Sequence, residues 1–411
     1  MLTLGLVFFI FLIFLKTKNS NYSIYYICFI SFFIICHFVY FISKDGFLDI
    51  NLNESDWQAF WQTVILLIMT VVTYRFTSVI IKIGPPQISI LKFNAGYRLL
   101  LFLYGVGVVI YTLQNGIALG LSYNDRLTAN TGGGISIILM YAYIPAMILA
   151  YINMPTRKNL FLCLCLSTLC GVVYYIVIGG SRNVLAAGVF SLIYLGLLYK
   201  NINKKQLFLA LALGVVTLML LELYRYVNNF SEALDFILNG GIQVILFAFE
   251  SFSPMHAVLN INDALMKNYF EIQYATTFLN EFSIIIPRFL WEGKPINVYN
   301  NGYFYTAEIL GLDTNLTMSP TFLGSCLIMF GQTFYWIGGV LSGLIIFLFD
   351  KIISSSKTRY TKLLLLSSIG YLFFWVRDGF EVYCYILIKF GIIMLIMYLF
   401  NSFISSLISR R

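Results

Sequence analysis

The sequence predicts an all-α polytopic membrane protein with about 11 transmembrane helices. Hydrophobic residues make up 60% of the 411 positions and charged residues only 11%, against roughly 25% in a typical soluble domain. The apolar runs are continuous rather than alternating, which favours helices over the strands of a barrel. This composition excludes a soluble enzyme, a disordered chain and a disulfide-stabilised scaffold.

Eleven apolar segments approach the roughly 20 residues that a membrane-spanning helix needs, and several fall short of that length. In chain order they are Leu2–Leu15, Tyr22–Ile42, Trp57–Ile83, Tyr97–Leu119, Ile135–Asn153, Leu160–Ile178, Val184–Tyr199, Gln206–Tyr224, Thr321–Phe349, Leu363–Val376 and Val382–Phe400. The first is predicted to be a retained helix rather than a cleaved signal peptide, because Lys16 and Lys18 follow its apolar core instead of preceding it.

The basic residues predict the orientation of these spans. If the N-terminus faces outward, 16 of the 26 Lys and Arg residues fall on the inner side, with Asp350 as the single acidic residue there. This bias follows the positive-inside rule, so the N-terminus is expected outside and the C-terminus in the cytoplasm. The net charge of +8 therefore indicates membrane topology rather than a nucleic-acid groove.

The domain organisation follows from the spans. Residues 1–224 hold predicted helices 1–8, residues 225–320 form a large periplasmic or extracellular loop, and residues 321–411 hold helices 9–11, all within one membrane domain. Loops this long are usually functional. Ser231–Leu238 is predicted to form a short helix within it, and Ile242–Phe252, too short to span, is expected to lie in the interface or to dip part way into the membrane. Because ATP and nucleotide sugars are absent outside, a transferase with its site on this face needs a lipid-linked donor.

No cofactor and no metal are expected. The seven Cys residues lie in apolar stretches without a C-x-x-C pair or an interleaved His, so they are interpreted as small hydrophobic residues rather than zinc ligands or disulfides. The chain also lacks a D-x-D motif, which is the usual metal-holding pair of nucleotide-sugar enzymes.

Two motifs place arginines at outer turns. Arg182 lies in Ile178-Gly-Gly-Ser-Arg-Asn183 at the outer end of the sixth span. Arg288 and Lys294 flank Trp291 in a turn bracketed by prolines in the large loop. A guanidinium can hold a diphosphate by paired hydrogen bonds, and an aromatic ring can pack on a sugar. The alternatives are a snorkelling Arg and an interfacial Trp anchor.

Further candidates are polar residues on the outer side. Arg225 directly follows the eighth span, where it either binds substrate or terminates the helix beside Glu222. His256 lies in the large loop with Glu250 six residues before it. A neutral His can remove a hydroxyl proton near pH 7, although a lone His is more often an ordinary polar residue.

Charged residues near the last span complete the set. Arg377, Asp378 and Glu381 lie in the short connection between the last two spans, and a solvated turn is favoured over the wall of a site. Lys389 lies about two turns into the last span. A charge there is costly, so it usually lines a cavity or has a partner.

With these motifs, the sequence resembles the Wzy-type O-antigen and capsule polymerases. The resemblance rests on Gly180-Ser-Arg182, on Pro287-Arg288 with Trp291 and Lys294-Pro295, and on Ser319-Pro-Thr-Phe-Leu-Gly324 leading to Phe330-Gly331. It implies a membrane glycosyltransferase of the GT-C type that works without metal. Such an enzyme moves a growing glycan from polyprenyl diphosphate onto a new lipid-linked repeat unit in the bacterial inner membrane.

The same resemblance implies roles for residues. Arg182 and Arg288 are the best matches for holding the diphosphate, and Lys294 is next. Glu250 and His256 are candidate general bases on chemical grounds. The remaining expected substrate-binding residues are Arg225, Trp291, Arg377 and Lys389.

The expected partners are the lipid-linked oligosaccharides that serve as donor and acceptor, membrane lipid, and, as further candidates, a chain-length regulator and a flippase. No nucleic-acid partner is expected. Three alternatives remain open: an O-antigen ligase, a lipid-linked oligosaccharide flippase, and a scaffold of a glycan-assembly complex without chemistry of its own.

Overall fold

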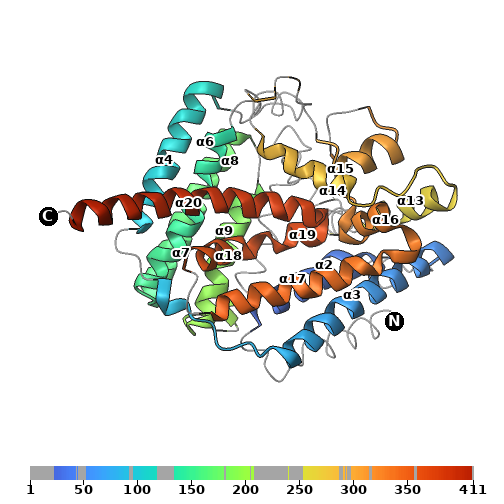
Figure 1. Cartoon of the computed structure of the whole chain (residues 1–411), viewed down its shortest axis with the longest axis horizontal. Helices are drawn as coiled ribbons and strands as arrows, with labels where there is room; N and C mark the ends of the chain where they lie inside the picture. The colour runs from blue at the N-terminus through green and yellow to red at the C-terminus, as the bar shows by residue number, and fades with distance from the viewer. Residues whose placement is uncertain are drawn as a thin grey trace. The chain divides into compact units, whose positions relative to one another are not determined.

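A computed structural model describes most of the chain, and every regular element within the described residues is helical. The described residues are 23–42, 44, 52–91, 96–117, 134–179, 182–203, 205–207, 239, 253–286, 290–291, 293, 298–313, 317–355 and 359–409. The predicted all-α class is confirmed. The chain divides into two compact units, each assembled from separate segments, and Figure 1 labels their helices.

Seven stretches in the described part of the chain are long and apolar enough to cross a membrane. They are Ile24–Ile42 (α2), Glu54–Ile80 (α3), Gly96–Asn115 (α4), Gly134–Asn153 (α6 Gly134–Met140 and α7 Tyr143–Asn153), Arg157–Ile178 (α8), Trp336–Ser354 (α17) and Phe380–Phe403 of α20 (Phe380–Ser409). The predicted span Leu2–Leu15, and most of Gln206–Tyr224, lie outside the described residues.

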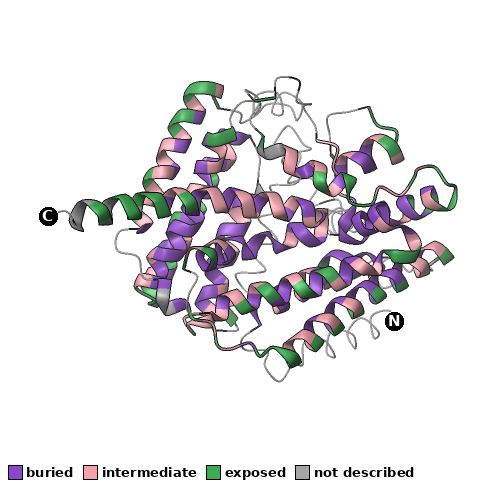
Figure 2. Ribbon diagram, viewed as in Figure 1, coloured by how far each residue is buried: buried purple, intermediate pink, exposed green. Residues whose placement is uncertain are grey.

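Apolar side chains point outward from these helices. Val79 on α3 is 79% exposed and Leu113 on α4 is 81% exposed, and both helices carry exposed faces in Figure 2. Water would disfavour such surfaces, whereas lipid accommodates them. The exposed faces therefore support a membrane location.

The first unit comprises Met1–Pro86, Asn239–Ser355 and Leu372–Tyr385. In it, α17 runs beside α2 and α3, although about 260 residues or more separate α17 from them in the chain. Short helices of the large loop, α13 (His256–Met266), α14 (Thr276–Glu281) and α15 (Asn301–Phe304), belong to the same unit, together with α16 (Thr321–Phe334) and α19 (Leu372–Asp378). This unit therefore combines predicted spans with much of the predicted outer loop.

A buried carboxylate joins three helices of the first unit. Asp350, near the end of α17, accepts hydrogen bonds from the backbone N–H groups of Tyr25 (2.8 Å) and Tyr26 (3.2 Å) in the first turn of α2. It also accepts one from the Tyr74 hydroxyl of α3 at 2.9 Å. The first N–H groups of a helix lack partners within the helix, so Asp350 satisfies two of them from a distant segment.

The second unit comprises Gln87–Leu238, Ser356–Tyr371 and Ile386–Arg411. It contains α4, α6, α7, α8, α9 (Arg182–Leu198), α18 (Arg359–Ser368) and most of α20. Thr156 caps α8 by accepting a hydrogen bond from the Asn159 N–H, and Gly179 ends α8 with a left-handed φ of 82°. The Tyr143 hydroxyl of α7 donates to the Val184 carbonyl of α9 at 2.7 Å, which fixes α9 against α7.

The predicted single helix Thr321–Phe349 is wrong. The structure has two helices there, α16 and α17, with non-helical backbone at Gly331 (φ 67°, ψ −177°). Only glycine adopts that conformation readily. Because the apolar run continues through the break, hydropathy alone does not reveal it, and α17 by itself is long enough to span.

The predicted span Leu363–Val376 is also interrupted. α18 ends at Ser368, a 3-10 turn covers Ile369–Tyr371, and α19 then continues from Leu372. The change of helix type leaves the buried, apolar character of the segment intact, so the sequence pattern again conceals the irregularity.

The kink at Gly331 provides a contact point for the large loop. The Ile328 carbonyl accepts a hydrogen bond from the Gln273 N–H at 3.0 Å, because the kink removes the regular geometry of the helix there. The Ile272 side chain covers Gly331, so that a Cβ atom at position 331 would lie 2.7 Å from Ile272 Cδ1. The kink and the loop segment therefore fit each other closely.

We expect Gly331→Ala to destabilise the protein by about 2–4 kcal/mol, from backbone strain and the collision with Ile272. The apparent Tm of the purified protein in detergent measures this loss. Gly105→Ala in α4 is the matched control, since a Cβ atom at Gly105 meets nothing within 4 Å and alanine favours a helix. A Gly331→Ala protein as stable as the control would contradict the kink.

Candidate functional site

A buried polar cluster lies in the first unit, where the large loop meets α16 and the α19–α20 turn. Its members are mostly inaccessible to solvent and come from four separate segments: Thr277, Glu281, Asn300, Asn301, Ser325 and Glu381. The two carboxyl groups, Glu281 and Glu381, are 4% and 0% exposed. Buried ionisable groups that cluster in this way are costly to desolvate and often mark functional sites.

Two consecutive asparagines connect the loop to α14. The Asn300 side chain donates to Glu281 Oε2 at 2.7 Å, and it also caps α15 by accepting from the Tyr303 N–H. The Asn301 side-chain oxygen accepts from the Thr277 hydroxyl at 2.6 Å. Asn300 thus uses both the donor and the acceptor of its side-chain amide. Asn301 uses its acceptor here, and its amide nitrogen donates to a further partner.

That next partner is Glu381, in the first turn of α20. Asn301 Nδ2 donates to Glu381 Oε1 at 2.9 Å, and the Ser325 hydroxyl of α16 donates to the same oxygen at 3.3 Å. Within the described residues, Oε2 has no hydrogen-bond partner. Gly379 (φ 118°) packs against this carboxyl group, since a Cβ atom there would come within 2.7 Å of it. Glu381 thus joins the loop, α16 and α20.

A neighbouring tyrosine strengthens the loop. Asn280 Nδ2 of α14 donates to the Tyr299 carbonyl at 3.2 Å, and the Tyr299 hydroxyl donates to Glu308 at 3.1 Å. Burial and the Glu308 carboxylate raise the pKa of Tyr299 to about 12. The hydroxyl therefore stays protonated and keeps its bond to Glu308 at any physiological pH.

The α19–α20 turn is not solvated, which corrects the favoured interpretation of its charges. Glu381 is fully buried, and the side chains of Arg377 and Asp378 are only 25% and 17% exposed. Arg377 Nη1 pairs with Asp378 at 2.9 Å, and the Ser319 hydroxyl donates to the Arg377 carbonyl. The turn is therefore part of a packed polar region.

The segment Ser319–Gly324, noted for its resemblance to the polymerases, meets this turn. Thr321 has a positive φ of 65°, which is rare for a β-branched residue. Its hydroxyl accepts from the Gly324 N–H at 3.1 Å, holding the first turn of α16. The motif therefore shapes the backbone that presents Ser319 to Arg377 and Ser325 to Glu381.

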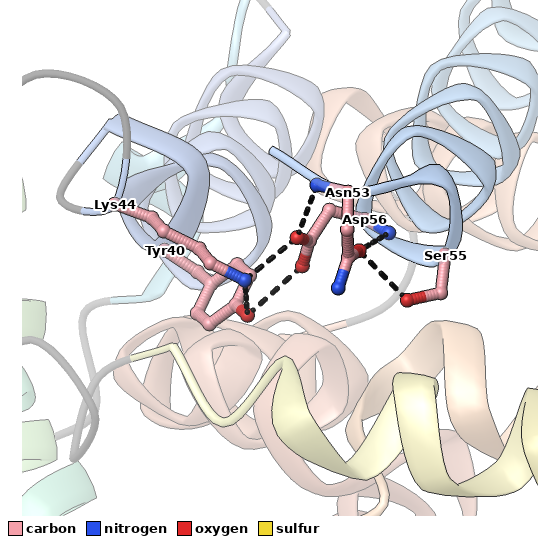
Figure 3. A network of polar contacts seen from close by, with 5 residues as sticks. All are labelled: Tyr40, Lys44, Asn53, Ser55 and Asp56. Atoms are coloured by element: carbon pink, nitrogen blue, oxygen red, sulfur yellow. Dashed lines mark hydrogen bonds and ion pairs between the residues drawn. The ribbon is translucent and has the colours of Figure 1, made fainter. Parts of the chain in front are cut away.

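His256 lies apart from this cluster, as the first residue of α13. It is exposed, and its ring contacts the Tyr40 ring edge-on with centroids 5.0 Å apart. The Tyr40 hydroxyl donates to Asp56 at 3.1 Å, and Lys44 pairs with Asp56 at 2.6 Å (Figure 3). The histidine therefore lies beside a fixed polar network and is itself exposed.

Polar contacts hold α13 in place. Asn262 and Gln62 of α3 exchange two side-chain hydrogen bonds of 2.8 and 3.1 Å. Gln332 Nε2 donates to Asn262 Oδ1 at 3.4 Å, and Asn260 donates to the Tyr305 hydroxyl at 3.0 Å. The helix that carries His256 is thereby tied to two apolar helices and to the rest of the loop.

Lys389 is buried in the second unit, where its partner is a tyrosine. Lys389 Nζ lies 4.5 Å from the centroid of the Tyr141 ring and donates to the Tyr141 hydroxyl at 3.2 Å. The Tyr371 ring stacks on the Tyr141 ring at a centroid distance of 6.0 Å. A cation over an aromatic face is stabilised by the ring quadrupole.

The other predicted residues are less fully described. Arg182 is the first residue of α9, and Trp291 is 39% exposed. Arg288, Lys294, Glu250 and Arg225 lie outside the described residues.

The sequence pattern does not mark Thr277, Glu281, Asn300 or Asn301 as members of a site. Each looks like an ordinary polar loop residue, and Glu381 is 80 positions from Asn301. The pair Asn300-Asn301 does suggest the start of a helix, because Asn is a favoured N-cap, and α15 begins there.

The long apolar helices with exposed apolar faces are those of a polytopic helical membrane protein. A family model described as WzyE protein, O-antigen assembly polymerase, matches residues 87–410. The match covers most of the chain, which therefore belongs to the WzyE family of O-antigen assembly polymerases. This confirms the family that the sequence motifs predict. No solved structure matches the chain.

Proposed function

We propose that this protein polymerises lipid-linked oligosaccharide repeat units at the outer face of the bacterial inner membrane. It transfers the growing glycan from polyprenyl diphosphate to a new repeat unit that is itself linked to polyprenyl diphosphate. The observation that carries the proposal is the family match over residues 87–410. The apolar helices, which suit a lipid-bound substrate, support it.

The reaction forms one glycosidic bond and breaks one bond to phosphate. A hydroxyl oxygen of the acceptor sugar attacks the anomeric carbon of the donor glycan, whose bond to the diphosphate oxygen breaks. The hydroxyl proton passes to a general base, and polyprenyl diphosphate departs with the bonding electron pair. Negative charge grows on the diphosphate, so preorganised cations lower the barrier.

In this proposal Arg182 and Arg288 stabilise the departing diphosphate, with Lys294 beside them. His256 or Glu250 accepts the proton. The exposed position of His256 on the anchored helix α13 is compatible with this role. Arg377 and Lys389 are proposed to contact substrate, together with Arg225 and Trp291. The GT-C architecture is part of the same proposal.

Contacts within the first unit are compatible with the alternation of the spans. Lys44 pairs with Asp56, and Asn301 with Glu381; all four are predicted to be outside. Lys351 Nζ donates to the Lys82 carbonyl at 2.8 Å, and both are predicted to be inside. Residues assigned to the same side are thus found together, as the predicted alternation of the spans requires.

Reporter fusions test the orientation. Because basic loops are retained in the cytoplasm, fusions after Lys205 and Lys357 are expected to report a cytoplasmic position. A fusion near Lys267 is expected to report the periplasm. Alkaline phosphatase and green fluorescent protein give opposite readouts at each position, so each fusion controls the other. A cytoplasmic readout at Lys267 would place the loop on the wrong side for this function.

The function itself is tested by deleting the gene and separating the surface glycans on a gel. Loss of long polymer with retention of single capped repeats supports a polymerase. Loss of all capping indicates a ligase, and accumulation of lipid-linked units on the inner side indicates a flippase; either result overturns the proposal. Polymer formation by the purified protein from isolated lipid-linked repeat units gives the direct confirmation.

A further inference from the structure

We propose that Tyr269 and Tyr274 form a binding subsite for the oligosaccharide part of the substrate. The inference rests on the proposed function and adds a contact to it. Both residues lie in the connection between α13 and α14, residues 267–275. The two residues are 77% and 69% exposed, although hydrogen bonds fix the backbone that carries them.

The end of α13 fixes the backbone of Tyr269. Asn268 adopts a left-handed φ of 53°, its N–H donates to the Leu265 carbonyl at 3.1 Å, and the Tyr269 N–H donates to the Ala264 carbonyl at 2.9 Å. This pair of bonds is the Schellman motif, which closes a helix with a defined exit direction. The direction in which the chain leaves α13 at Tyr269 is therefore set by the helix cap.

A tight turn fixes Tyr274. The Thr276 N–H donates to the Gln273 carbonyl at 3.0 Å, and Tyr274 inside this turn has a φ of 48°. A bulky residue rarely adopts a left-handed conformation, where glycine or asparagine would cost less. Such strain persists where the surrounding structure enforces it, commonly at ligand sites.

The connection is anchored to two other elements. The Phe270 ring contacts the Phe304 ring of α15 edge-on at 5.2 Å. Ile272 covers Gly331 of α16, and the Gln273 N–H donates to the Ile328 carbonyl. Phe270, Ile272 and the Gln273 backbone therefore anchor the connection, while Tyr269 and Tyr274 remain exposed.

This arrangement suits a sugar chain. Tyrosine rings are rigid and amphipathic, so they offer contact area at a low cost in side-chain entropy. Polar side chains stand near them in sequence: Glu271 is exposed, and Lys267 pairs with Asp263 at 2.7 Å on the surface. These three charges sum to −1, which disfavours an anionic lipid surface, and all three groups can hydrogen-bond to hydroxyls.

The test measures polymerisation by the full-length protein in nanodiscs, with lipid-linked repeat units isolated from the host as the probe. Tyr269→Ala and Tyr274→Ala are each expected to raise the KM for the repeat unit about three- to tenfold with kcat little changed. Tyr269→Phe and Tyr274→Phe keep the rings and are expected to stay near wild type. Tyr398→Ala, which removes a tyrosine 52% exposed on α20, is the matched control.

A second readout separates this proposal from the proposed function. Oligosaccharide released from the lipid by mild acid is tested for binding to the same proteins by saturation-transfer NMR. Binding that weakens in both alanine variants supports the subsite even if the wild-type protein does not polymerise. Unchanged KM and unchanged binding in both alanine variants would overturn it. So would a loss confined to incorporation into nanodiscs, which would assign the tyrosines to the membrane interface.

Discussion

Glu381→Ala is expected to abolish long polymer and to lower the stability of the protein by about 3 kcal/mol or more. The substitution strands two buried donors, the Asn301 amide and the Ser325 hydroxyl, and leaves a cavity against Gly379. Glu381→Gln keeps an oxygen for both donors, so it is expected to lose much less stability. The apparent Tm in detergent and the glycan ladder measure the two effects.

Two further variants establish that the loss belongs to this cluster. Glu54→Ala removes an exposed carboxylate in the first turn of α3 and is expected to change stability by less than about 1 kcal/mol. Asn301→Ala removes the partner, so combining it with Glu381→Ala is expected to cost clearly less than the sum of the single changes. Additive effects would show that the two residues act independently.

Arg288→Lys is expected to fail nearly as badly as Arg288→Ala, and the same is expected at Arg182. Lysine keeps the charge but loses the paired donor geometry that a guanidinium offers to a diphosphate. A loss of about 3 kcal/mol in transition-state stabilisation lowers the rate roughly a hundredfold. The measurement is polymer formation from purified lipid-linked repeat units at matched protein concentrations.

Arg157→Ala is the control for these arginine variants, because Arg157 is exposed at the start of α8 on the predicted inner side. It is expected to leave the polymerisation rate unchanged. Near-normal polymer from Arg288→Ala or Arg182→Ala would remove that arginine from the proposed site and leave it a role in topology alone.

Sequence predicts the helical class and several spans well because long apolar runs are a local property. The predicted Tyr22–Ile42 and Leu160–Ile178 agree closely with α2 and α8. Local pattern fails where a break carries no change in hydropathy, as at Gly331, whose conformation only the folded backbone reveals. Glycine is common in apolar runs, so its presence alone did not mark the kink.

The candidate site was harder to predict than the helices. The motif Ser319–Gly324 and the charges at Arg377 and Glu381 were visible in the sequence, but nothing local indicated that they meet. Burial also changes what a charged side chain requires, because protein donors must replace water. In an exposed turn Glu381 would be solvated, whereas inside the fold it requires the donors that Asn301 and Ser325 supply.

The carboxylate of Asp350 has a consequence for the order in which the protein is made. The ribosome completes α2 long before it reaches Asp350, 325 positions after Tyr25. During that interval the N–H groups of Tyr25 and Tyr26 must rely on water or lipid headgroups at the membrane surface. The first unit therefore cannot form all its final hydrogen bonds until the late helix α17 has inserted. In a nascent chain that stops before residue 350, the first N–H groups of α2 lack their Asp350 acceptor.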